Sequence, residues 1–231
     1  MIELREVRVT VPGAAPGIGP RELLSDVTLT LTEQRIAVVG ANGSGKSTLL
    51  RLLNGLILPS QGHVRVDGLD TATHGGDVRR RVGFVFTDPL AQLVMPTPIE
   101  DVALSLRRTL PRAERRERAA QLLAAYGLGH VQHSSVYDLS GGERQLVALV
   151  SVLAVEPAVV VADEPTTLLD LRNRNRIRDE LARLDQQLIV ATHDLELAQD
   201  AERVLVVDGG RIVVDGPPDV AIAAYVELVG G

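Results

Sequence analysis

Several residue types that define particular classes of protein are scarce or missing from this 231-residue sequence. There is no cysteine, which excludes a disulfide framework and thiolate chemistry. There is no tryptophan, and aromatic residues make up only 2% of the chain, so the hydrophobic core must be built from aliphatic side chains. The 24 basic residues include a single lysine, Lys46. A lysine at only one place is expected where a compact ammonium group is needed rather than a planar guanidinium.

The sequence also lacks an excess of positive charge and any long apolar run. Its net charge is −6, which argues against nucleic acid as the main partner, because binding to phosphate backbones needs a basic surface. The N-terminus has no basic region followed by an apolar run, as a signal peptide would. Apolar runs such as Leu146–Val155 end well short of the roughly 18 residues that cross a bilayer. We therefore expect a soluble, cytosolic protein that could act at a membrane only through a partner.

Hydrophobic residues make up 45% of the chain, and their spacing predicts alternating strands and helices. Apolar and polar residues alternate over residues 2–11 and 23–31, as in half-buried strands, and Pro12–Pro20 between them has the composition of a loop. Further strands are predicted at Arg35–Val39, His63–Val66, Val82–Phe86, Ala158–Ala162, Leu188–Ala191 and Val204–Val207. Helices are predicted at Lys46–Leu56, Glu100–Arg108, Arg112–Tyr126 and Glu143–Val155. Helices between apolar strands indicate βαβ units and a parallel sheet, in one large domain or two closely packed lobes.

A glycine-rich segment follows the predicted strand Arg35–Val39. Residues Gly40–Ser47 match the pattern G-x-x-x-x-G-K-[ST], with a strand before the pattern and a helix after it. Glycines allow successive backbone N–H groups to converge on phosphate oxygens, and the start of the helix adds its positive dipole end. Lys46 is expected to bridge the β- and γ-phosphates, and the Ser47 hydroxyl to bind Mg²⁺. The predicted ATP-binding residues here are Gly40, Asn42, Gly43, Ser44, Gly45, Lys46, Ser47 and Thr48.

Two acidic residues, Asp163 and Glu164, follow the apolar strand Ala158–Ala162. Acids at the carboxyl end of a parallel strand face the crevice in which open α/β sheets bind their ligands. Asp163 is suited to hold Mg²⁺, directly or through water. Glu164 is the candidate general base for an attacking water molecule. The alternative interpretation of these two acids is a solvated Asp-Glu-Pro turn without a role in binding. The presence of the phosphate-binding pattern in the same chain favours the functional interpretation.

The segment Leu139–Gln145, Leu-Ser-Gly-Gly-Glu-Arg-Gln, precedes the acidic strand and narrows the class of nucleotide-binding protein. Ser140 and the glycine N–H groups after it would cap a helix and form an anion site. The segment resembles the signature motif of ABC ATPases, and it stands where that family keeps it. By the same resemblance, Asp170 matches the D-loop aspartate, and His193 matches the switch histidine that contacts the γ-phosphate. We interpret the other four histidines as incidental.

The resemblance to ABC ATPases implies an α/β P-loop fold over residues 1–231 as a single domain. It implies a RecA-like core, an N-terminal antiparallel β subdomain and a helical lobe inserted at about 88–155. Because few residues follow the last predicted strand, we expect no long C-terminal regulatory domain. It also implies that two chains, identical or different, enclose two ATP molecules with Mg²⁺. In that arrangement Lys46, Glu164 and His193 are catalytic. The residues implied to act on the partner subunit's ATP are Ser140, Gly141, Gly142 and Glu143.

Three positions depart from the family pattern, and one of them, Leu169, stands where a small residue is usual in the D-loop. Thr87 stands where the family has a glutamine that reaches the metal and the attacking water, so Thr87 or the nearby Gln92 is the candidate for that role. Val11 stands at the position of the aromatic residue that stacks on adenine. The attraction between a base and an aromatic ring is then lost, and we expect weaker or less base-selective binding.

The segment Phe84–Val102 resembles the ATPases of energy-coupling-factor importers for vitamins and metals, and among them those of biotin importers. Cobalt, nickel and other vitamins remain as alternative cargoes, and a soluble ABC ATPase outside transport remains as an alternative class. The resemblance implies a transmembrane coupling protein and a substrate-binding membrane protein as partners, and a place at the cytoplasmic face of the cell membrane. Asp101, Val102 and the arginine-rich stretch Arg107–Arg118 would then lie near the membrane partner. A simpler interpretation of those arginines is a solvated helix face paired with Glu114 and Glu117.

Overall fold

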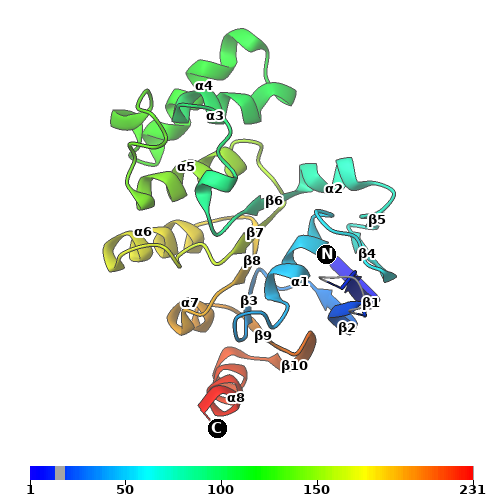
Figure 1. The fold of residues 1–231 in the computed structure, drawn as a ribbon. Helices are drawn as coiled ribbons and strands as arrows, with labels where there is room; N and C mark the ends of the chain where they lie inside the picture. Colours follow the sequence, from blue (N-terminus) through cyan, green and yellow to red (C-terminus); the bar gives the residue numbers. More distant parts are fainter. Residues whose placement is uncertain (14–18, 231) are drawn as a thin grey trace.

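The computed structural model describes residues 1–13 and 19–230, and its centre is a six-stranded sheet in the order β10-β9-β3-β8-β7-β6 (Figure 1). Neighbouring strands from β9 to β6 run parallel, whereas β10 runs antiparallel to β9. The predicted α/β class with a parallel sheet is confirmed. The strands are β3 (Arg35–Val39), β6 (Val82–Val85), β7 (Val159–Asp163), β8 (Gln187–Ala191), β9 (Arg203–Asp208) and β10 (Arg211–Gly216).

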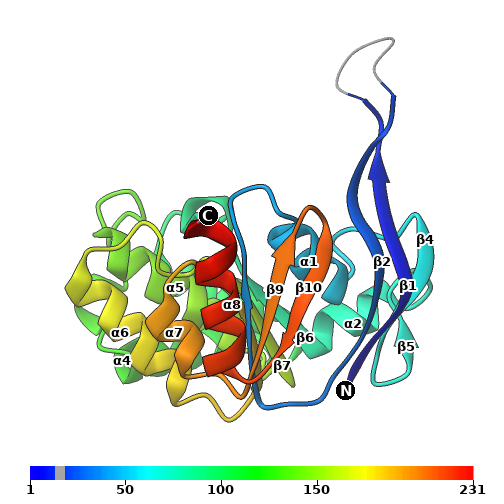
Figure 2. The same cartoon turned by 90° about the horizontal axis from the view of Figure 1, so that it is seen from below.

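A second, antiparallel sheet is formed by the N-terminal part of the chain, in the order β2-β1-β4-β5. Its strands are β1 (Ile2–Val11), β2 (Arg21–Leu31), β4 (Gln61–Val66) and β5 (Leu69–Asp70). Strands β1 and β2 extend together beyond the rest of the molecule (Figure 2). Of the predicted loop Pro12–Pro20, residues 14–18 lie outside the described residues.

Helices connect the strands and cover both faces of the larger sheet. The helices are α1 (Lys46–Leu53), α2 (Gly75–Arg81), α3 (Pro98–Ser105), α4 (Arg112–Ala125), α5 (Gly141–Leu153), α6 (Leu171–Ala182), α7 (Leu195–Gln199) and α8 (Pro218–Gly230). The chain between β6 and β7 contains α3, α4 and α5 and no strand, and α3 and α4 lie at one end of the molecule (Figure 1). Helix α1 ends three residues before the predicted Leu56, because Gly55 takes a positive φ of 67°. In the described part of the chain, no helix combines the length and apolar character that crossing a membrane requires.

The alternation of side chains along the central strands creates two hydrophobic cores, one on each face of the larger sheet. Ile36 and Val38 of β3 join a core with the buried leucines of α1 and the inner face of the antiparallel sheet. Ala37 and Val39 point to the opposite face, into a core with α5, α6 and α7. This two-residue period is the property of an extended strand that places a layer on either side. The sheet edge that carries the loops after β3 and β7 is therefore held rigidly from both faces.

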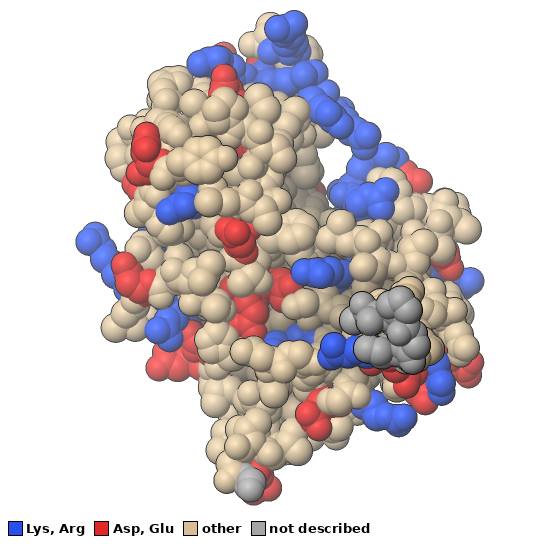
Figure 3. Space-filling view, viewed as in Figure 1, with Lys and Arg blue, Asp and Glu red and all other residues tan. Residues whose placement is uncertain are grey.

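Arginines gather at the outer end of the molecule over α4, where blue side chains mark the upper edge of Figure 3. Within residues 1–13 and 19–230, the arginines of the stretch 107–118 form no ion pair, and neither do Glu114 and Glu117. The predicted pairing of these charges along the helix is therefore wrong, although most of the arginines are exposed as expected. Asp101 and Val102, which we expected near a membrane partner, are both buried. The Asp101 carboxylate instead accepts hydrogen bonds from the backbone N–H groups of Val94 and Met95.

Candidate nucleotide-binding site

The loop between β3 and α1 has a backbone that only glycine fits at two positions. Gly40 has a φ of +156°, and a Cβ atom there would lie 2.2 Å from the backbone oxygen of Val207. Gly45 has a φ of +115°, and a Cβ atom there would lie 3.0 Å from the backbone oxygen of Leu23. A side chain at either position would push the loop away from the strands behind it. The glycines of the pattern thus allow the loop to lie tightly against the sheet before it enters α1.

Lys46 is the first residue of α1, and its side chain is almost fully buried beneath the loop. The Nζ atom donates hydrogen bonds to the backbone oxygens of Gly40, at 2.8 Å, and Ala41, at 3.2 Å. It also lies 3.6 Å from Oε1 of Glu164. The hydroxyl of Ser44 is buried in the same loop without a hydrogen-bond partner in the described structure. Buried polar atoms are rarely left unpaired, so an ammonium and an orphaned hydroxyl here indicate a ligand with anionic oxygens.

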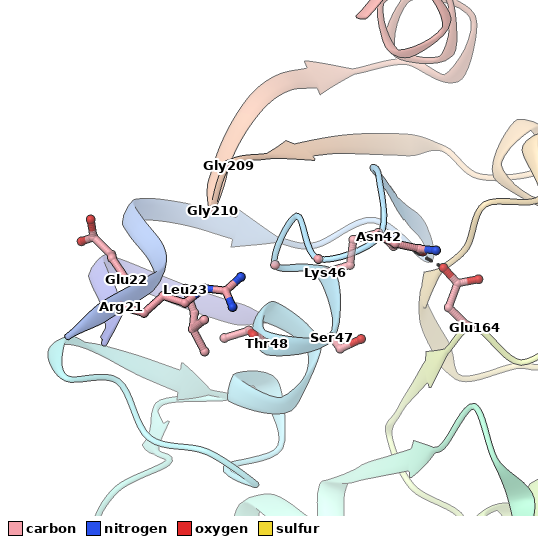
Figure 4. A pocket seen from close by; sticks show the side chains of 12 residues that line it. Arg21, Glu22, Leu23, Asn42, Lys46, Ser47, Thr48, Glu164, Gly209 and Gly210 are labelled. Carbon is pink, nitrogen blue, oxygen red and sulfur yellow. Dashed lines mark ion pairs between the residues drawn. The ribbon is translucent and has the colours of Figure 1, made fainter. Parts of the chain in front are cut away.

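A cavity of about 390 Å³ opens over this loop (Figure 4). The residues that line it are Arg21, Glu22, Leu23, Asn42, Gly43, Gly45, Lys46, Ser47, Thr48, Glu164, Gly209 and Gly210. The cavity therefore combines the predicted phosphate loop with the start of β2 and with the turn between β9 and β10. Its volume falls within the range of small-molecule and cofactor sites. Neither the β2 residues nor the Gly-Gly turn was predicted, although Gly-Gly between two apolar runs is a hairpin signal.

We call the pair formed by Ser47 and Asp163 the polar floor of the site; Ser47 lines the cavity, whereas Asp163 is hydrogen-bonded to Ser47 but does not itself line the cavity. The Ser47 hydroxyl donates a hydrogen bond to Oδ1 of Asp163 at 2.9 Å. Asp163 is 2% exposed, and burial raises the pKa of its carboxyl above the usual value, against the opposing effect of the Ser47 hydrogen bond. The Thr87 hydroxyl donates to the backbone oxygen of Asp163 at 2.8 Å, so Thr87 lies beside the floor but contacts its main chain.

Glu164, the next residue, is held by a residue of its own loop and by one from the loop after β8. Its φ of +51° is unusual for a residue with a side chain, and such backbone strain is concentrated at functional sites. Oε2 accepts a hydrogen bond from the Thr167 hydroxyl at 2.9 Å and lies 2.7 Å from Nδ1 of His193. The structure thus brings Lys46, Glu164 and His193 together at the edge of the cavity.

The residues of the signature segment lie elsewhere in the chain, at the start of α5. Ser140 caps this helix and forms a capping box with Glu143. The backbone N–H of Glu143 donates a hydrogen bond to the Ser140 hydroxyl oxygen. In return, the backbone N–H of Ser140 donates one to Oε2 of Glu143 at 2.9 Å. The Ser140 hydroxyl also donates a hydrogen bond to the Glu143 carboxylate, and the hydrogen bonds from Ser140 lower the pKa of Glu143. Gly142 is packed against Asn173. The backbone N–H of Asn173 donates a hydrogen bond to the carboxylate of Asp170, which caps the start of α6. Within the described residues, none of the four signature residues lines the cavity, so one chain does not bring them to its own phosphate loop.

Several other predicted residues also lie outside the cavity lining, among them Gly40, Ser44, Gln92 and Val11. The side-chain amide of Gln92 accepts a hydrogen bond from the backbone N–H of Phe86 and donates one to the backbone oxygen of Ala148. This amide therefore links the residue that follows β6 to α5 rather than facing a metal. Val11 pairs with Arg21 across the β1-β2 hairpin, and it is Arg21 that reaches the cavity.

The glycine-rich loop, its buried lysine and the serine–aspartate pair define a P-loop nucleoside triphosphatase. A family model described as "ABC transporter" matches residues 24–167, and by this match the chain belongs to the ABC transporter family; it is an ATPase.

The relatives of the chain cover almost its whole length. It is 49% identical over 228 residues to a protein of Deinococcus radiodurans named "Putative ABC transporter ATP-binding protein", with 98% of each chain covered. It is 43% identical to the "Biotin transport ATP-binding protein BioM" of Rhizobium etli, with 96% of this chain and 99% of the relative covered. The solved dimeric structure of the ATP-binding cassette MJ0796, in a post-hydrolysis state with ADP and Pi, matches with a TM-score of 0.84 at 30% identity. That match covers 94% of this chain and 99% of the other.

Proposed function

We propose that the chain is the ATP-hydrolysing motor subunit of an energy-coupling-factor importer that takes up biotin. It acts at the cytoplasmic face of the cell membrane, where two ATPase subunits bind a transmembrane coupling protein and a substrate-binding membrane protein. The identity to a biotin transport ATP-binding protein over nearly the whole chain supports this cargo. The observation that carries the ATPase part is the cavity over Lys46, with the orphaned Ser44 hydroxyl beside it.

The residues of the polar floor fit a magnesium ion that accompanies ATP. The Ser47 hydroxyl and the Asp163 carboxylate are hard oxygen donors within 2.9 Å of each other. The described residues contain no group of three or more acidic, histidine or cysteine side chains that could hold a metal alone. This agrees with a magnesium site in which substrate phosphates and water supply the remaining ligands. When bound, the ion neutralises charge on the transferred phosphoryl group.

Lys46 and Glu164 carry the protein's own part of the reaction. When ATP enters, the Lys46 ammonium exchanges its bonds to the Gly40 and Ala41 carbonyls for bonds to phosphate oxygens, and the Ser44 hydroxyl gains a partner. Glu164, which lies 3.6 Å from Lys46 before binding, is then free to accept a proton from the attacking water. His193 lies next to Glu164 and holds this carboxylate, and in our proposal it contacts the γ-phosphate of bound ATP.

A second ATPase subunit, identical or different, completes each site. The start of α5 presents Ser140, Gly141 and Gly142 outside the cavity of their own chain. A helix N-terminus with free N–H groups stabilises an anion, so these residues would bind the γ-phosphate of ATP held by the partner subunit. Closure of the two subunits on ATP and their opening after hydrolysis would drive the membrane partner through contacts that differ between the two states.

The role of Glu164 is tested by Glu164→Gln, which keeps the shape of the side chain and removes the base. We expect the variant to bind ATP and to hydrolyse it about 100-fold more slowly or worse, and to accumulate as a dimer with ATP on size-exclusion chromatography. Glu156→Gln is the matched control, because Glu156 has the same φ of +51° but lies outside the cavity. Turnover at the wild-type rate in Glu164→Gln would contradict the assignment.

The transport role is tested by affinity purification of the tagged chain from native membranes, with identification of the proteins that accompany it. We expect a transmembrane coupling protein and a second membrane protein that binds biotin. If the second membrane protein binds cobalt, nickel or another vitamin, the proposed cargo changes and the proposed importer role stands. Recovery of soluble partners alone would indicate an ABC ATPase that works outside transport. The proposed roles of the residues in ATP hydrolysis would be unaffected by that result.

A further inference from the structure

The wall of the cavity that faces the phosphate loop is formed by the first residues of β2, and one of them is an arginine. In Figure 4 the Arg21 side chain crosses the cavity toward Thr48, whereas Glu22 on the same strand points away. The Lys46 side chain lies at the other side, beside Glu164, with which it forms the ion pair drawn in the figure. Arg21 is exposed, and within residues 1–13 and 19–230 it has no ion pair and no side-chain hydrogen bond. The Arg21 guanidinium therefore lies at the cavity without a partner among the described residues.

No aromatic ring reaches this cavity from the described part of the chain. The sequence has two phenylalanines, three tyrosines and no tryptophan, and all five aromatic residues lie in the described ranges. None of them lines the cavity. The rings of Phe84 and Phe86 contact each other in a tilted arrangement, with centroids 4.7 Å apart, in β6 and just after it. A nucleotide base bound here finds no phenylalanine or tyrosine ring among the described residues of this chain, so a planar partner that this chain supplies must be of another kind.

The strand register explains why Arg21 is the side chain that reaches the cavity. Val11, the last residue of β1, is the direct partner of Arg21 in the antiparallel β1-β2 pair. Residues directly opposite each other in such a pair project from the same face of the sheet. Val11 is too short to reach across the cavity, whereas the longer side chain of Arg21 does so from the neighbouring strand.

We propose that the guanidinium of Arg21 is the planar surface on which the base of the bound nucleotide stacks, and that it sets the affinity for the base rather than for the phosphates. This rests on the proposed binding of Mg-ATP in the same cavity. A guanidinium is planar, weakly hydrated and always charged, and it stacks on the face of an aromatic ring system. The phosphates already have their cationic partner in Lys46 and the N–H groups of the loop. The end of the cavity at Arg21 is thus the end left for the base.

The test compares ATP with inorganic tripolyphosphate, which has the same chain of phosphates and no base. Affinities for both, with Mg²⁺, are measured by calorimetry for the wild type, Arg21→Ala, Arg21→Tyr and Arg21→Lys. Arg65→Ala is the matched control, since Arg65 is an exposed arginine of the same antiparallel sheet outside the cavity. We expect Arg21→Ala to weaken ATP binding roughly 5- to 10-fold and to leave the affinity for tripolyphosphate within about twofold. We also expect Arg21→Tyr to restore ATP binding better than Arg21→Lys does.

Two results would overturn the stacking role of Arg21. One is an equal loss of ATP and tripolyphosphate in Arg21→Ala with rescue by Arg21→Lys, which would make Arg21 a phosphate ligand. The other is an ATP affinity in Arg21→Ala equal to that of Arg65→Ala. Lys46→Ala separates this inference from the proposed function: it should weaken both ligands. If Lys46→Ala binds ATP as the wild type does, the phosphate-loop assignment fails, and the stacking role of Arg21 fails with it.

Discussion

Asp163 is placed where its charge disfavours the folded protein when nucleotide and metal are absent. The carboxylate is 2% exposed, and burial raises its pKa in the folded chain. A raised folded pKa means that the folded state binds the proton more tightly than the unfolded state does. The resulting stabilisation is present below the ordinary carboxyl pKa and is lost as the pH rises through the raised value. At neutral pH the ionised Asp163 therefore makes the nucleotide-free protein less stable than it would be with a neutral side chain.

The substitution Asp163→Asn tests this reasoning, because the amide has the same shape and can still accept the Ser47 hydrogen bond. Relief of a buried charge of this kind is worth about 1 kcal/mol. For a domain of this size that corresponds to a rise of about 2–4 °C in the thermal unfolding midpoint. The measurement is calorimetric unfolding at pH 7 with a chelator and without nucleotide. The variant should at the same time lose Mg-dependent ATP hydrolysis.

The pH dependence supplies the control for this prediction. As the pH falls toward about 4, the ordinary range of aspartate, the wild-type carboxyl becomes protonated and the difference between the two proteins should vanish. Saturating Mg-ATP should raise the midpoint of the wild type and have much less effect on the variant, because only the wild type offers the ionised ligand. A variant that is less stable than the wild type at pH 7, or a difference that does not change with pH, would refute the argument.

Three further changes test other parts of the structure. We expect Thr87→Gln to raise ATP turnover, because a longer amide can reach the metal side of Asp163; lower turnover would mean that the natural hydrogen bond matters more. Gly40→Ala should weaken ATP binding more than tenfold in calorimetry, since its φ is positive and its Cβ would meet a backbone carbonyl, whereas Gly76→Ala should bind normally. Arg203→Ala should lower the unfolding midpoint by about 4–8 °C, because Arg203 bonds two carboxylates and a backbone oxygen; an unchanged midpoint would contradict this.

The parts of the fold that local pattern determines could be predicted from the sequence. Strand β3 has the predicted bounds, Arg35–Val39, because five apolar residues end at the glycine of the phosphate loop. Strand β10 (Arg211–Gly216) was not predicted, since it is an edge strand without a buried residue. Helix α2 was missed as well: it begins with Gly75 and Gly76 and ends in three arginines, so it carries no apolar period.

The same division applies to the candidate site. Lys46, Asp163 and Glu164 could be predicted because each lies at a fixed offset from a strand in a short motif. The opposite wall of the cavity could not, since Leu23 and Gly210 approach the loop through contacts between residues more than 180 positions apart. A Cβ at Gly210 would lie 2.8 Å from the Leu23 backbone oxygen, which is a constraint of packing that no local pattern encodes. The choice of Arg21 over Val11 depends on the register of the β1-β2 pair, in which the two residues are direct partners, and this register too was not evident from the sequence.

The single lysine gives this chain one side chain that amine-directed reagents can modify. Lys46 is the only side-chain amine among 231 residues, and it is 6% exposed in the site. Reagents that acylate amines can therefore modify one side chain only, besides the α-amino group. The extent of this reaction, read as a mass increase of the intact protein, would report how often the phosphate loop opens to solvent, and ATP should protect it. Enzymatic or chemical acetylation of lysine in this chain would similarly have a single target, and its consequence would be loss of the ammonium group at the phosphates.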